Sequence, residues 1–174
     1  MDDFQIDLRD LKEGLTEMSF LLDDDFFGRL EGATLKRGRL RCDLSVNRTD
    51  TFFELKFHIS GMVIVPCDLC LDDMEQPIEA NETLACQLGE EDRSDDELVV
   101  VARENGVLDI SWFVYEFVNL AVPIRHVHAP GKCNAAMIKA LEEHSATRSS
   151  DEDDAENMDP RWSELKKLKT IIKD

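Results

Sequence analysis

Residues 40–59, LRCDLSVNRTDTFFELKFHI, contain two successive runs in which apolar and polar side chains alternate. Alternation with a period of two is typical of a strand that buries one face. The apolar phase of the two runs consists of Leu40, Cys42, Leu44, Val46, Phe53, Leu55, Phe57 and Ile59. Polar residues 47–50 separate the runs, so the stretch predicts an antiparallel hairpin.

Extended runs also flank the hairpin. Upstream, residues 4–8 and 15–22 have strand-like patterns, and DDDFFGRL predicts a short helical turn that begins at Asp25 or a neighbour. We expect Gly61 to break the chain before a short buried strand over residues 62–66. Further strands are expected over 74–88 and 97–102, on either side of an acidic loop that covers 89–97.

The second half of the chain has helical spacing instead. After Asp109, a suitable N-cap, residues 110–122 place Phe113, Phe117 and Leu120 on one helical face, and Pro123 ends the run. A second helix is expected from about Asn134. Together these patterns predict an α+β fold, in which a mostly antiparallel curved sheet or partial barrel of about six strands packs against helices from the C-terminal half.

The composition changes near the C-terminus. Residues 1–146 are expected to form one α+β domain, and residues 147–159 a polar, acidic and disordered linker. Residues 160–174 are expected to form a basic amphipathic helix with an apolar stripe. This helix either docks on the domain or binds a partner, and its candidate partner-binding residues are Trp162, Leu165, Lys166, Lys167, Leu168 and Lys169.

The overall charge limits the partners. The 174 residues carry a formal net charge of −18, with an isoelectric point near 4.5. A broad basic face for DNA is therefore not expected, because phosphate contacts need clustered lysine and arginine. No apolar run reaches the length of a membrane span, and the N-terminus has no secretory signal pattern. Five cysteines, an odd number, favour a reducing cytoplasm over a disulfide framework.

The cysteines fall into two groups. Cys42 and Cys86 lie on the apolar phase of strands and are expected to be buried core residues. Cys67 and Cys70 form a C-x-x-C at a strand end, where a redox role is disfavoured because nearby aspartates should raise the thiol pKa values.

A metal site would need two further ligands. The loop over residues 123–133 contains His126, His128 and Cys133. Cys67 and Cys70 together with the H-x₄-C of His128 and Cys133 would make a Cys₃His set suited to tetrahedral zinc. Spacing alone leaves a second interpretation open, in which C-x-x-C is a tight turn with free thiols.

Four segments in the same order resemble the YceD-like family, the large ribosomal RNA subunit accumulation proteins. They are GMVIVPCDLCLDDMEQPIE, LDISWFVYEFVNLAVP after the acidic loop, HAPGKC, and DPRWSELKKLK. Trp162 stands where the family usually has phenylalanine. The resemblance covers roughly residues 1–172, with a loose pattern in the N-terminal third.

The resemblance implies a cytoplasmic, non-catalytic ribosome-biogenesis factor that supports accumulation of large-subunit ribosomal RNA. Its implied partner is the precursor RNA or a large-subunit ribosomal or assembly protein. The resemblance also favours a shared metal or structural site at Cys67, Cys70, His128 and Cys133. Two alternatives stay open: a metal-dependent ribonuclease or hydrolase that acts on ribosomal RNA precursors, and a protein-only adaptor with a structural zinc site.

Overall fold

The computed structural model describes residues 4–90, 92–94 and 98–145. The chain divides into two compact units, Met1–Asn134 and Ala135–Asp174, which are considered separately. The elements of the first unit are β1 (Gln5–Asp7), β2 (Gly14–Leu22), α1 (Asp24–Arg29), β3 (Gly38–Thr49), β4 (Phe52–Pro66), β5 (Asp73–Gly89), β6 (Arg93–Ser94), β7 (Val99–Ala102), β8 (Val107–Asp109) and α2 (Ser111–Ala121). The second unit contains α3 (Ala135–His144), so the helix expected from about Asn134 is confirmed.

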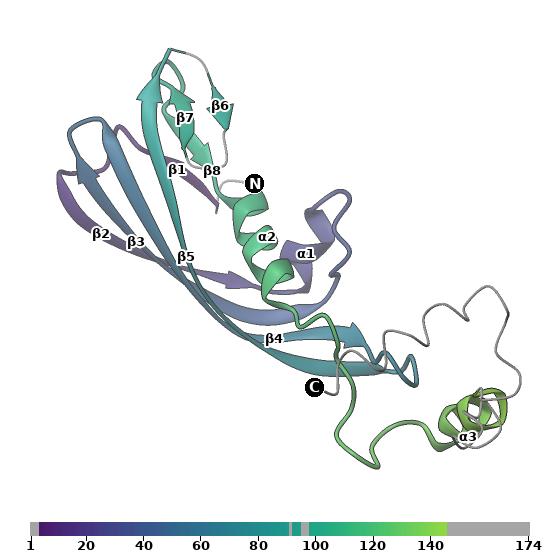
Figure 1. Ribbon diagram of the computed structural model, residues 1–174. Coiled ribbons are helices and arrows are strands. Elements are labelled where there is room, and N and C mark those ends of the chain that lie inside the picture. Colours follow the sequence, from purple (N-terminus) through teal and green to yellow (C-terminus); the bar gives the residue numbers. More distant parts are fainter. Residues whose placement is uncertain (1–3, 91, 95–97, 146–174) are drawn as a thin grey trace, which may run out of the picture. The chain divides into compact units, whose positions relative to one another are not determined.

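A six-stranded sheet forms the body of the first unit, with the strand order β2-β3-β4-β5-β7-β6. Its pairs are antiparallel except for β5 and β7, which run parallel. The short strands β1 and β8 form a separate antiparallel pair. The predicted α+β class with a curved, mostly antiparallel sheet is therefore confirmed, and the sheet is not closed into a barrel (Figure 1).

The predicted hairpin is present, but it is longer than the pattern indicated. Cys42 pairs with Ile59, and Leu44 with Phe57, so the apolar phases of β3 and β4 share a face. The expected connection over residues 47–50 is wrong, because β3 continues to Thr49. The chain reverses after Thr49 instead, at Asp50, whose φ of 54° is left-handed and suits a short polar residue.

The expected strand break at Gly61 is also wrong. β4 runs without interruption from Phe52 to Pro66, and Gly61 pairs with Leu40 on one side and Ile78 on the other. Gly61 has a φ of 151°, and a Cβ atom there would lie 2.3 Å from the carbonyl oxygen of Arg39. Glycine therefore lets two long strands approach closely where they bend, instead of ending one of them.

Helices α1 and α2 lie on the same side of the curved sheet, as Figure 1 shows. The expected short helix is confirmed as α1: Asp23 is its N-cap and accepts a hydrogen bond from the Phe26 amide. Phe26 and Phe27 of α1 are buried against the sheet. The fully buried Phe53, Leu55 and Ile59 of β4 belong to the same core.

Helix α2 is present, but its buried face differs from the prediction. Val114, Tyr115 and Val118 are buried, whereas Leu120 is 80% exposed. Phe113 and Phe117 pack against the core at its margin. The N-cap residue is Ile110 instead of Asp109, although the Asp109 carboxylate still accepts hydrogen bonds from the amide and hydroxyl of Ser111.

Other predictions can be compared directly. Cys42 and Cys86 are fully buried and free, as expected. The loop over 89–97 contains the two-residue strand β6, which the acidic pattern did not indicate. The expected linker over 147–159 and helix over 160–174 lie outside the described residues. None of the described helices is long and apolar enough to span a membrane.

Candidate metal centre

Cys67 and Cys70 lie in the tight connection between β4 and β5. The connection is closed by two backbone hydrogen bonds, from the Leu71 amide to the Cys67 carbonyl and from the Cys67 amide to the Asp72 carbonyl, both 2.9 Å. Leu71 has a φ of 62°, the left-handed conformation that glycine or asparagine adopts more readily. This turn places both sulfur atoms on the same side, and both cysteines are buried.

The second half of the site comes from the segment that follows α2. Residues 123–134 contain no buried residue, so apolar packing contributes little to their position. A clasp of polar contacts holds them against the cysteine turn. The Asp68 amide donates to the His126 carbonyl at 3.0 Å, the Asp68 carboxylate accepts from the His126 amide at 2.7 Å, and the Asn134 side chain donates to Asp72 at 3.2 Å.

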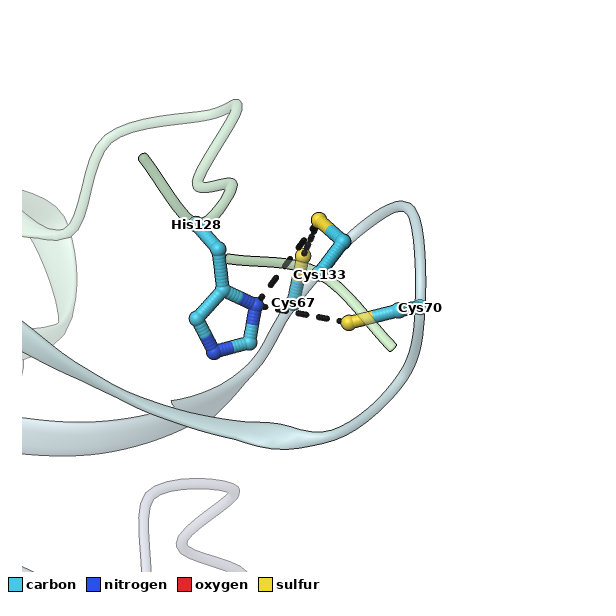
Figure 2. Close-up of side chains that lie close together, drawn as sticks. All are labelled: Cys67, Cys70, His128 and Cys133. Atoms are coloured by element: carbon cyan, nitrogen blue, oxygen red, sulfur yellow. Dashed lines mark hydrogen bonds between the residues drawn. The ribbon is translucent and has the colours of Figure 1, made fainter. Parts of the chain in front are cut away.

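The two halves bring four ligand atoms together (Figure 2). Cys70 Sγ lies 3.3 Å from His128 Nδ1, and Cys133 Sγ lies 3.9 Å from both His128 Nδ1 and Cys67 Sγ. All four ligand atoms lie within 4.8 Å of one another. The predicted proximity of Cys67, Cys70, His128 and Cys133 is therefore confirmed, although the widest spacing exceeds the roughly 4 Å that tetrahedral ligation requires.

The three shorter distances, 3.3 to 3.9 Å, are close to those around a tetrahedral ion. With metal–sulfur bonds of about 2.3 Å, the sulfur atoms of a tetrahedron lie about 3.8 Å apart, close to the spacing of Cys67 and Cys133. Three thiols and one imidazole are ligands that zinc prefers, and a set of four protein ligands leaves no position open for water. The residues present therefore fit a closed, structural zinc site.

The local backbone prepares Cys67 for a metal. Burial raises the pKa of its thiol, but hydrogen bonds from the backbone amides of Cys70, His128 and Leu69 and from the Cys70 thiol lower the pKa to about 6. The expectation that nearby aspartates raise the thiol pKa is therefore wrong for Cys67, because hydrogen-bond donors to its sulfur outweigh burial. Burial and the neighbouring sulfurs of Cys67 and Cys70 raise the pKa of Cys133 to about 11.

His126, the third candidate in the loop, is not part of the cluster. Its Nδ1 lies 3.0 Å from the Pro123 carbonyl oxygen, and its Nε2 faces Asp68 at 3.6 Å. It therefore helps to position the loop. The contacts of Asp68 and Asp72 with this loop were not predicted, and the only sequence signal for them is the density of acidic residues in and just after the C-x-x-C.

The fold and the cluster define the chain as an α+β protein with a candidate closed Cys₃His metal centre. A family model matches residues 55–169, a range that contains all four cluster residues. The chain belongs to this family, described as large ribosomal RNA subunit accumulation protein YceD. The match leaves out the N-terminal third, so it is narrower than the resemblance over roughly residues 1–172. Neither the curated proteins nor the solved structures contain a match.

Proposed function

We propose that the protein is a non-catalytic ribosome-biogenesis factor of the cytoplasm. It supports accumulation of large-subunit ribosomal RNA by binding the precursor RNA or a large-subunit ribosomal or assembly protein. Family membership over residues 55–169 is the observation that carries this proposal, because the family is described by its effect on accumulation of the large ribosomal RNA subunit. DNA and membranes are not among the proposed partners.

In this proposal zinc has a structural role. Cys67, Cys70, His128 and Cys133 would hold it, and it would fix the segment after α2 against the turn between β4 and β5. The closed set of four protein ligands supports this role over a hydrolytic one, since catalytic zinc keeps one position open for water or substrate.

The basic segment 160–174 is the proposed partner-binding element. Its sequence carries five basic residues against two acidic ones, about +3 on a chain of net charge −18. Trp162, Leu165 and Leu168 would supply the apolar contacts, and Lys166, Lys167 and Lys169 the contacts with an acidic or phosphate-bearing partner. The acidic stretch before the segment would act as an extended tether.

Co-sedimentation of the tagged protein with ribosomal precursors, followed by sequencing of the bound RNA, tests the proposal. We expect the intact chain to sediment with large-subunit precursors, and a chain that lacks residues 159–174 to fail while its domain unfolds at nearly the same temperature. Normal co-sedimentation of the shortened chain would place the contact elsewhere. Absence of the intact chain from all precursors would refute the proposal. Cleavage of precursor RNA by the pure protein, lost in a Cys70→Ser variant, would support the ribonuclease alternative.

A further inference from the structure

We propose that the free edge of β2, with the groove beside it, is a docking site for an extended basic segment of a partner protein. The strand would be added to the sheet next to β2. The inference goes beyond the proposed function, because it concerns a surface that the metal centre does not use. It holds whether or not the chain acts on ribosomal precursors.

Strand β2 is a sheet edge that can accept another strand. It pairs with β3 through all nine of its residues, and the described residues contain no strand on its other side. An edge strand presents unpaired amide and carbonyl groups, which proteins usually protect with proline, lysine, a bulge or a short length. β2 contains neither proline nor lysine, and its register with β3 has no bulge.

The exposed side chains of this edge are apolar at both ends. Leu15 and Leu21 are 66% and 75% exposed. Only Glu17 places a charge between them. A partner strand that pairs with this edge would cover part of both leucine side chains.

A groove of about 640 Å³ adjoins the C-terminal half of β2. Its apolar wall is a cluster of rings, in which Phe4 lies 5.2 Å from Phe20 and 4.7 Å from Phe26 between ring centres. Phe4 precedes β1, Phe20 belongs to β2 and Phe26 to α1, so three consecutive parts of the N-terminal region meet here. Leu21 and Leu30 complete the apolar lining.

The charges around the groove decide which partner fits. Asp23, Asp25 and Asp109 line it, against a single cation, Arg29. A basic strand with alternating apolar residues would therefore place lysine or arginine near these carboxylates and its apolar side chains near the leucines. A second copy of this chain is disfavoured as the occupant, since β2-to-β2 pairing would bring two acidic rims together on molecules of net charge −18.

Synthetic peptides test the surface directly. The probe is a ten-residue peptide of alternating arginine and valine; the controls replace arginine with glutamate or place two prolines in the middle. Binding is followed by fluorescence anisotropy, and the site is located by hydrogen exchange of the full chain. We expect the basic peptide alone to bind, more weakly at high salt, and to slow amide exchange in β2.

Two variants and a matched control complete the design. Leu21→Asp and Asp25→Lys should each weaken peptide binding about tenfold. Leu120→Asp changes a leucine that is 80% exposed near the end of α2, away from the groove lining, and it should leave binding within about twofold. Asp25→Lys alters an exposed helix residue, so it tests the inference even if Leu21→Asp lowers stability.

Several results would overturn the inference. They are equal binding of the glutamate or proline peptide, exchange protection outside β2, and equal weakening by the Leu120→Asp control. Dimerisation of the free protein through β2, or higher affinity for the peptide after removal of residues 159–174, would show that another occupant covers the edge. Peptide binding at β2 by a protein that fails to sediment with precursors would support this inference while refuting the proposed function.

Discussion

Removal of one ligand at the metal centre should abolish most of the stabilisation that zinc provides. His128→Asn is the informative change, because His128 Nδ1 lies 3.3 Å from Cys70 Sγ and 3.9 Å from Cys133 Sγ. His126→Asn is the matched control: His126 lies in the same loop, but its imidazole contacts Pro123 and Asp68 and not the sulfur atoms.

The size of the effect follows from the chain length between the two halves. Cys70 and His128 are 58 residues apart in sequence. An unfolded chain that assembled the same four ligands would have to close that loop. By the relation used for disulfides, closure of a loop of this length costs about 4 kcal/mol at 25 °C. In the folded chain the loop is already closed, so zinc should bind the folded state more favourably than the unfolded state by about this amount. Saturating zinc should therefore stabilise the fold by about 4 kcal/mol, or raise Tm by roughly 8–16 °C.

Thermal unfolding with saturating zinc, compared with unfolding in a strong chelator, measures this difference. The wild-type protein and His126→Asn should show the full zinc-induced rise in Tm, and His128→Asn less than about half of it. Elemental analysis should find about one zinc per wild-type chain. A wild-type Tm that does not respond to zinc, or an equal response in His128→Asn, would refute the reasoning.

Three further predictions concern the pH response and the packing of the sheet. Without metal, the free energy of unfolding should fall as the pH is lowered from about 9 toward 6. The fold lowers the Cys67 pKa to about 6, so the stabilisation by its thiolate is complete only above the ordinary thiol pKa and is lost as the pH approaches 6. Chemical unfolding across this range measures the effect, and a flat profile would contradict it. Gly61→Ala should lower the unfolding free energy by about 2–4 kcal/mol, because the added Cβ would clash with the Arg39 carbonyl oxygen. The control Gly28→Ala adds a Cβ with no atom within 4 Å, so it should be neutral or slightly stabilising. Tyr115→Phe should cost about 1–2 kcal/mol in urea unfolding, because the hydroxyl accepts from the Thr34 amide at 2.7 Å, and an unchanged midpoint would show that the contact is not needed.

The strands could be predicted because alternation of apolar and polar residues with a period of two directly indicates which side chains are buried. Leu44 and Phe57 alternate with polar or charged neighbours, and each strand has one buried face. The strand break predicted at Gly61 was wrong because a glycine gives the same local sequence signal for a chain break and for a close approach of two strands. Only the pairing with Leu40 and the short distance to the Arg39 carbonyl distinguish the two.

The face of α2 was harder to predict than its existence. Most of its residues are apolar, so more than one face satisfies the helical spacing. Val114 and Val118 pack into the core, whereas Leu120 is exposed near the end of the helix. The four ligand residues, by contrast, could be predicted from residue type and spacing, since cysteine and histidine combinations carry their own chemistry. The clasp between Asp68 and His126 could not, because it joins an exposed and a half-buried polar residue through contacts that no periodicity encodes.

The two halves of the metal centre are held by different forces. The cysteine turn continues two long strands, and Cys67 and Cys70 are buried, so the core already positions this half. The segment 123–134 has no buried residue, and Ile124 is fully exposed. Polar contacts at exposed positions contribute little each, because water competes for them. The clasp can therefore guide the segment to the turn, but two metal bonds, to His128 and Cys133, would supply most of the free energy that keeps it there. A small closed metal site would thus stabilise the position of this segment, a role that apolar packing has elsewhere in the fold.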